Sequence, residues 1–448
     1  MKIRNLFLFA ILGTFLASCH TEQKAQSPEV WSKNAVIYEV NVRQYTVEGT
    51  FNAFANRLPQ LKELGVDVLW FMPIYPISKE ARKGTLGSYY SVQDYKGINP
   101  EFGKAEDFKA LVQKAHEMGF KVILDWVANH TGRDHIWMKQ HPDWYVKDSL
   151  GHALAPFDWT DAAKLDYKNT AMRSAMQESM AYWVKEFDVD GFRCDVAGEV
   201  PTDFWNDTRA KLNKIKPVFM LAEADKAELT KKAFNADYNW PLLGVMNDIA
   251  KGKKVATDID KVLAHHDSIY PPTSFKMNFV TNHDENSWNG SEYERMGAGV
   301  NAFVILSYTY PGIPLIYTGQ EVGLKKRLSF FEKDTVANWN NPAVFSFYKK
   351  LNELKHTQPA LAVGKNSGKF IRYATTSPTL YIFERKVKGN EVLVVLNLSA
   401  QNQTINFTKA KPSGACTDYF QNMKTDASRL EGAMLMPWQY KVYISNKK

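Results

Sequence analysis

The stretch Gly191 to Asp195 carries an arginine and an aspartate two residues apart. It reads as a short β-strand, on which alternate side chains share a face, so Arg193 and Asp195 are expected side by side. A guanidinium beside a carboxylate favours the ionised acid and fixes its orientation. An ionised, oriented carboxylate at a strand end can act as a nucleophile. A partly buried ion pair that closes the strand explains this pentapeptide equally well.

Other polar residues fall where further strands are expected to end. Apolar runs predict eight strands, at about 36–40, 66–72, 121–125, 191–196, 218–223, 237–243, 275–280 and 313–317. Helical patterns between them, such as 51–64 and 105–118, end at glycines. Near-continuous apolar strands separated by helices are typical of a parallel sheet covered on both faces. Eight such units predict a (β/α)8 TIM barrel, since no glycine-rich phosphate loop follows the first strand.

The strand ends of such a barrel meet at one mouth, which here would gather several charged and polar side chains. They are Asp125, Asn129, His130, Arg193, Asp195, Glu223, Asn282, His283 and Asp284. Any one of them could be a helix cap or stabilise a loop, but packing does not explain their convergence. With two carboxyl groups about 5–5.5 Å apart, one acid protonates a glycosidic oxygen while the other attacks the anomeric carbon, with retention. A third carboxylate can hold sugar hydroxyls.

The rest of the chain divides around this barrel, which is assigned to residues 31–360. Residues 131–170 are rich in aromatic side chains and predict a short insertion after the third strand. Residues 361–448 contain short β-type runs and predict a C-terminal antiparallel β-sandwich domain. We expect that domain to support the barrel rather than to bind sugar separately.

Bulk composition excludes some classes of function. The 448 residues carry a formal charge of +8 without a basic block or a nucleic-acid-binding motif, so nucleic acid is not an expected partner. Hydrophobic residues make up 45% of the chain, which excludes a disordered protein. Cys194 and Cys416 are expected to be inert buried thiols.

The N-terminus resembles a bacterial lipoprotein signal. A basic start and a short apolar run end at Leu16-Ala17-Ser18-Cys19. Residues 1–18 would be the signal peptide, Cys19 the lipidated residue and 19–30 a polar tether. An ordinary secretory signal is the alternative. Histidine follows Cys19 in place of the aspartate that often retains lipoproteins at the inner membrane, which favours the outer membrane, on its periplasmic or surface face.

At the predicted strand ends the sequence resembles the α-amylase family of retaining (β/α)8 enzymes that act on α-glucans. Six segments match in order over nearly the whole chain following the signal. They are Val92–Gly103, Asp125–His130, Gly191–Asp195, Leu221–Glu223, Phe279–Asp284 and Tyr317–Glu321.

The resemblance implies a role for each matched residue. Asp195 would be the nucleophile, Glu223 the general acid and then base, and Asp284 the third catalytic acid, which holds the distorted sugar. Tyr90, His130 and His283 would contact that sugar, Arg193 would fix Asp195, and Asp125 would orient the site.

Two departures from the family pattern bear on function. Many members carry Lys-His where this chain has Gly198-Glu199, on the leaving-group side. In calcium-binding members Asn129 and the acid matching Asp166 are ligands, with a backbone oxygen at the position of Glu199. Because Ca²⁺ prefers six to eight oxygens, the resemblance leaves a calcium cofactor open. No organic cofactor is implied.

The resulting hypothesis is a lipid-anchored retaining hydrolase of α-1,4-linked starch or maltodextrin. Within the same class, an exo-acting or transglycosylating relative stays open, such as an α-glucosidase, neopullulanase or cyclomaltodextrinase. A non-catalytic starch-binding lipoprotein is the alternative from another class. It should have lost a catalytic carboxylate, and Asp195, Glu223 and Asp284 are all present.

Overall fold

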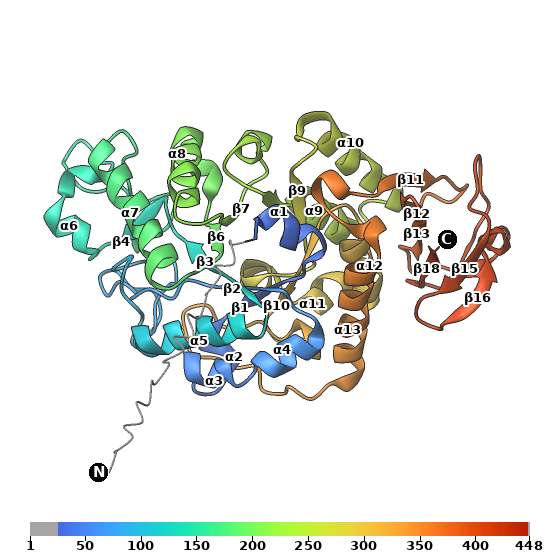
Figure 1. Ribbon diagram of the computed structural model, residues 1–448, viewed down its shortest axis with the longest axis horizontal. Helices are drawn as coiled ribbons and strands as arrows, with labels where there is room; N and C mark the ends of the chain where they lie inside the picture. The colour runs from blue at the N-terminus through green and yellow to red at the C-terminus, as the bar shows by residue number, and fades with distance from the viewer. Residues whose placement is uncertain (1–25, 447–448) are drawn as a thin grey trace, which may run out of the picture.

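Eight parallel strands close into a barrel in the computed structural model, which describes residues 26–446 (Figure 1). The strands follow one another around the barrel in chain order, which confirms the predicted (β/α)8 fold. Nearly every strand residue is buried, because helices cover the outside and side chains fill the inside. The strands are β1 (Ile37–Val40), β2 (Val68–Phe71), β3 (Lys121–Trp126), β6 (Gly191–Cys194), β7 (Phe219–Ala222), β8 (Ala236–Tyr238), β9 (Phe275–Asn278) and β10 (Ile313–Tyr317).

The helices begin and end at residues that suit those positions. Asn169 caps the helix α7 by accepting a 3.0 Å bond from the Met172 amide. The helix predicted at 51–64 is two helices, and the second carries Pro59 in its first turn, where the missing N–H costs nothing. The helices are α1 (Pro28–Trp31), α2 (Val42–Tyr45), α3 (Phe51–Ala55), α4 (Leu58–Leu64), α5 (Ala105–Glu117), α6 (Ile136–Gln140), α7 (Thr170–Glu186), α8 (Thr202–Asn213), α9 (Trp240–Ala250), α10 (Ile259–Ile269), α11 (Glu292–Met296), α12 (Val300–Thr309) and α13 (Pro342–Thr357).

The register of the central strands sets the height of the polar residues. Asp125 of β3 pairs with Arg193 of β6. Cys194 of β6 pairs with Ala222 of β7, so the residues that follow, Asp195 and Glu223, leave their strands at the same level. Both acids therefore lie at the same mouth of the barrel.

The segment after β3 forms a small antiparallel unit at the mouth. Strand β4 (His130–Gly132) pairs with β5 (Ala162–Lys164), and α6 lies between them in sequence. The Gly132 amide also donates a 2.7 Å bond to the Val92 carbonyl in the loop that follows β2. The insertion is thereby attached to the barrel rim.

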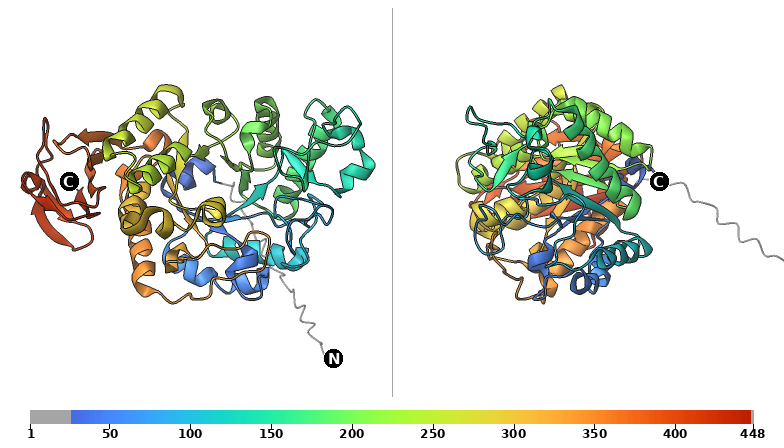
Figure 2. Two further views of the ribbon diagram at one scale, coloured as in Figure 1. Left: turned by 180° about the vertical axis from the view of Figure 1, so that it is seen from behind. Right: turned by 90° about the vertical axis from the view of Figure 1, so that its left-hand side faces the viewer.

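The C-terminal region is a six-stranded antiparallel sheet with a two-stranded sheet, β14–β17, that shares its apolar core. Figure 2 shows this region at one end of the long axis of the molecule. It contacts the barrel through α12, for example where Arg385 donates a 3.1 Å bond to the Thr309 carbonyl. The strands are β11 (Lys369–Tyr373), β12 (Leu380–Val387), β13 (Asn390–Asn397), β14 (Gln403–Thr404), β15 (Ala415–Asp418), β16 (Met423–Asp426), β17 (Met434–Leu435) and β18 (Tyr440–Asn446).

The predicted signal peptide 1–18, Cys19 and most of the tether lie outside the described residues. Within 26–446 no helix has the length and apolar character needed to cross a membrane. Cys194 and Cys416 are both free thiols, but only Cys194 is buried, so the expectation of two buried thiols was wrong for Cys416.

Candidate active site

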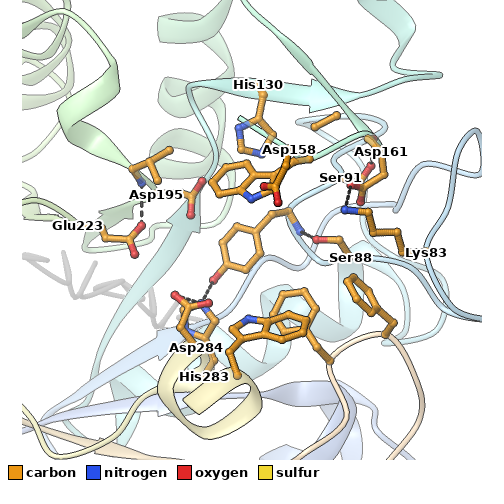
Figure 3. Close-up of a pocket in the computed structure, with 17 residues that line it drawn as sticks. Lys83, Ser88, Ser91, His130, Asp158, Asp161, Asp195, Glu223, His283 and Asp284 are labelled. Carbon is orange, nitrogen blue, oxygen red and sulfur yellow. Dashed lines mark hydrogen bonds and ion pairs between the residues drawn. The ribbon is translucent and has the colours of Figure 1, made fainter. Parts of the chain in front are cut away.

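A pocket of about 410 Å³ opens at the carboxyl ends of the barrel strands. Six of the predicted site residues line it: Tyr90, His130, Asp195, Glu223, His283 and Asp284 (Figure 3). They come from the start of β4, from the segments that follow β6, β7 and β9, and from the loop after β2. The barrel thus brings together the acids that the sequence argument expected at one mouth.

Arg193 lies beneath the pocket and ties three carboxylates together. Its Nη1 lies 2.8 Å from Asp125 Oδ1 and 3.1 Å from Asp195 Oδ1, and its Nη2 lies 2.8 Å from Glu223 Oε2. The guanidinium is fully buried. An unpaired buried charge would cost several kcal/mol, whereas this one is matched by carboxylates on both of its terminal nitrogens.

Burial changes the pKa expected for Asp195. It raises that pKa well above its usual value and nearby Glu223 adds to the rise, so together they outweigh the lowering effect of Arg193 on which our expectation rested. Burial likewise raises the pKa of Glu223 against the opposing effect of Arg193. Two close carboxylates resist ionising together, which favours a state of the pair in which one of them keeps its proton. Such a pair supplies one acid and one carboxylate at the same pH.

Asp125 and Arg193, which the resemblance gives the roles of orienting the site and fixing Asp195, do not line the pocket. Asp125 is wholly buried, and its Oδ2 accepts bonds from Tyr90 OH at 3.1 Å and from Trp70 Nε1 at 3.2 Å. Both residues lie one layer below the cavity and hold the side chains that face it. They act as positioning residues, because their contacts are with other site side chains and not with the cavity.

The residue after Asp195 has a strained backbone. Val196 has φ +35° and ψ +46°, a left-handed conformation that is rare for a β-branched residue and costs about 1–3 kcal/mol. The turn aims the Val196 amide at Glu223 Oε2, 2.8 Å away. The strain therefore fixes one acid of the pair relative to the other.

Glu39 is a residue of the site that sequence reasoning missed. It lies in β1, fully buried, with Oε1 2.5 Å from His283 Nδ1, while His283 Nε2 lies 2.6 Å from Tyr90 OH. Burial lowers the pKa of His283, but Asp284 and Glu39 outweigh it and raise the pKa to about 9. The signal was available as a lone carboxylate inside an apolar strand. His283 is therefore a cation at neutral pH.

We expect Glu39→Gln to remove that charge near neutral pH. A hydrogen bond to a charged group is worth roughly 1.5–3 kcal/mol, so kcat/KM at pH 8 should fall about 10- to 100-fold, with a smaller loss at pH 5. Histidine NMR titration of the variant should show the pKa of His283 well below about 9. Unchanged titration would contradict the role of Glu39.

His130 has the opposite charge state. Burial lowers its pKa to about 3, so it is neutral at working pH. Its ring lies 5.3 Å from that of Trp159, and both line the pocket. The two histidines therefore offer a sugar a charged donor on one side and a neutral partner on the other.

The two predicted calcium ligands lie close together but do not make a site on their own. The Asn129 carbonyl accepts a 3.1 Å bond from Leu165, the residue before Asp166, and Asp166 Oδ1 accepts one from the Lys168 amide. Across residues 26–446 no group of three or more His, Cys, Asp or Glu side chains could hold a metal ion. Two side chains supply only part of the six to eight oxygens that calcium prefers, so backbone oxygens and water would have to supply the rest.

Calcium binding stays a prediction, tested by thermal unfolding. If Asn129 and Asp166 hold calcium together with backbone oxygens and water, EDTA should lower the melting temperature and excess calcium should restore it. Asn129→Ala should abolish that response. An identical melting curve with and without EDTA would remove calcium from the account.

Sequence reasoning also missed part of the pocket wall. Trp159, Trp288, Phe330 and Phe331 line it, and Trp288 is 52% exposed. Aromatic residues are usually part of the core, so the residue types alone did not indicate a binding site. Only their position in the pocket lining separates them from core aromatics. Outside the pocket lining, Lys226 Nζ donates a 2.6 Å bond to the carbonyl of Gly198, where this chain departs from the family's Lys-His pair.

Comparison with known proteins agrees with this geometry. A family model described as the α-amylase catalytic domain matches residues 21–162 and 144–341. Alpha-amylase 3 of Dictyoglomus thermophilum is 28% identical over 95% of this chain and 96% of its own length, and a cyclomaltodextrinase of Thermoanaerobacter pseudethanolicus is 28% identical over 80% and 65%.

Two solved structures are similar over nearly their whole length. An α-amylase from Lactobacillus plantarum has 31% identity and a TM-score of 0.82, covering 92% of this chain and 99% of its own. A maltogenic α-amylase from Thermotoga neapolitana has 29% identity and a TM-score of 0.84, covering 93% and 99%.

Proposed function

The chain belongs to the α-amylase family of glycoside hydrolases, and we propose that it hydrolyses α-1,4-glucosidic bonds of starch or maltodextrins with retention at the anomeric carbon. Asp195 is the nucleophile and Glu223 the acid and base. The observation that carries the proposal is the pair of pocket carboxylates held on two nitrogens of Arg193.

The first step breaks the glycosidic bond. Glu223 gives its proton to the leaving oxygen while an oxygen of Asp195 bonds to the anomeric carbon, and the leaving sugar departs as an alcohol. A raised pKa keeps Glu223 protonated for this task. The protonated His283, with Asp284 beside it, holds hydroxyls of the sugar that Asp195 attacks.

The second step releases that sugar. Glu223, now a carboxylate, takes a proton from water as the water oxygen bonds to the anomeric carbon, and the bond to Asp195 breaks. Two inversions give net retention. The acid pair returns to its starting protonation, with one proton held between Asp195 and Glu223.

A product profile tests the proposal. Protein lacking the signal segment is incubated with starch, pullulan and maltoheptaose, and early products are separated. We expect maltooligosaccharides from starch and maltoheptaose, and none from Asp195→Asn protein under the same conditions. Starch binding without cleavage by the unmutated protein would move it to the starch-binding class.

We also propose that the chain is exported and anchored through lipid on Cys19, on the strength of the signal-like N-terminus. Lipid chains supply about 0.8 kcal/mol per buried methylene, enough for stable anchoring when several are present. Labelled fatty acid should enter the full-length protein and not the Cys19→Ala variant. A fully soluble, unlabelled native protein would contradict the anchor.

A further inference from the structure

The pocket extends away from the two catalytic acids to an end lined by other polar side chains. Figure 3 shows Lys83, Ser88 and Asp161 at the side of the pocket opposite Glu223. Lys83 and Ser88 belong to the loop that follows β2, and Asp161 belongs to the insertion just before β5. The side chains that close this end thus come from two different excursions of the chain.

An ion pair joins those two excursions. Lys83 Nζ lies 3.2 Å from Asp161 Oδ1, and the Asp161 side chain is only 6% exposed. A second bond reinforces the junction, because Ser91 Oγ donates to the Asp161 carbonyl at 2.8 Å. An ordinary surface ion pair contributes little to stability. Because Asp161 is buried, this pair should contribute more.

The same loop is fastened on its other side to the loop after β10. The Leu86 amide donates a 3.0 Å bond to the Phe331 carbonyl, and the Thr85 amide a 2.9 Å bond to Glu332 Oε1. Gly84 allows this close approach: it has φ +62°, and a Cβ there would lie 2.6 Å from Phe331 Cβ. Three loops joined to one another therefore form the pocket wall on this side, since residues of each line the pocket.

The chemistry decides which end of a glucan meets the wall. The general acid protonates the leaving oxygen, so the leaving portion lies on the side of Glu223. The portion that bonds to Asp195 extends the other way, toward Lys83 and Asp161. That portion carries the non-reducing end, so the wall limits how far a chain can extend in that direction.

We propose that the Lys83–Asp161 pair makes the enzyme exo-acting, receiving the non-reducing end of an α-glucan and releasing one short product of defined length. This inference rests on the proposed function. The ammonium and carboxylate can bond the hydroxyls of the terminal sugar, since polar groups in a largely apolar pocket fix orientation. Trp288, whose ring lies 5.1 Å from that of Phe330, provides an exposed face on which a sugar can stack.

The test compares maltoheptaose having a free non-reducing end with maltoheptaose blocked there by a 4,6-ethylidene group. The unmutated enzyme should cleave the blocked substrate with kcat/KM at least tenfold lower, and should release a single short product from the free one. Lys83→Ala and Asp161→Asn should bring the two kcat/KM values within about threefold. Lys79→Ala, an exposed lysine of the same loop outside the pocket, should keep the original ratio.

Equal cleavage of both substrates by the unmutated enzyme would overturn the exo inference and leave retaining hydrolysis in place. A tenfold preference that survives in both folded wall variants would overturn the assignment to the ion pair. No cleavage of either substrate would instead refute the proposed function, so the two failures are distinguishable. Melting curves establish that the variants are folded.

Discussion

Asp195→Asn should lower kcat on maltoheptaose by roughly 10⁴-fold or more, equivalent to about 5.5 kcal/mol of transition-state stabilisation. An amide has nearly the shape of a carboxylate but cannot form the bond to the anomeric carbon. Asp195 lies 3.1 Å from Arg193 Nη1 and lines the pocket, whereas Asp125, which shares that nitrogen, does not line the pocket and cannot replace it. The loss should therefore fall on turnover.

The same variant should be at least as stable as the unmutated enzyme. Burial raises the pKa of Asp195, which means that the folded state disfavours its charge. For a carboxyl of raised pKa, the cost to stability begins as pH rises above the unfolded-state pKa and is complete above the raised folded-state pKa, so a neutral amide relieves that cost at neutral pH. We expect an equal or higher melting temperature together with retained maltoheptaose binding. Near-normal turnover would remove Asp195 from its role; loss of fold would make it structural.

Glu223→Gln should lower kcat by about 10²- to 10⁴-fold, the range typical of a lost general acid–base. Glutamine keeps the bond from the Val196 amide to position 223 but has no proton to give. The loss should shrink on a maltoside with a good leaving group, such as dinitrophenolate, because that group departs without protonation in the first step. Parallel assays on maltoheptaose and the activated maltoside measure the difference.

The pH profile checks the same residue. The pKa of Glu223 is raised from its usual value by burial. Because the protonated form is active in bond cleavage, activity falls as pH rises through that pKa, which gives the basic limb. The limb should be absent in Glu223→Gln and unchanged in Glu199→Gln, an exposed glutamate of the same mouth. A basic limb that persists in Glu223→Gln would assign it to another acid.

The strands and the positions of the acids were predictable because they depend on local patterns. Buried parallel strands are apolar runs, and a strand end is marked by the first charged residue after the run, as at Asp195 and Glu223. The eighth-strand segment 313–317 coincides with β10 for this reason. By contrast, β15, β16 and β17 are short and partly exposed, so their sequences contain no apolar run from which a strand could be predicted.

Contacts between residues far apart in the sequence could not be predicted from the sequence alone. Glu39 and His283 are 244 positions apart, and only closure of the barrel brings β1 beside the loop after β9. The sharing of Arg193 among three carboxylates likewise depends on the register of β3, β6 and β7. Burial of Asp195, together with nearby Glu223, reversed the expected direction of the pKa shift at Asp195. The Lys83–Asp161 pair could not be predicted either, because it joins two loops and hydrophobic periodicity does not determine the path of a loop.

The configuration of the first product tests the central claim most directly. Proton NMR of a fresh reaction with maltoheptaose, recorded before mutarotation, resolves the α- and β-anomers of the newly formed reducing end. Double displacement at Asp195 predicts that the α-anomer accumulates first and then decays toward equilibrium. Initial release of the β-anomer would show a single inversion by water and would contradict a covalent bond to Asp195.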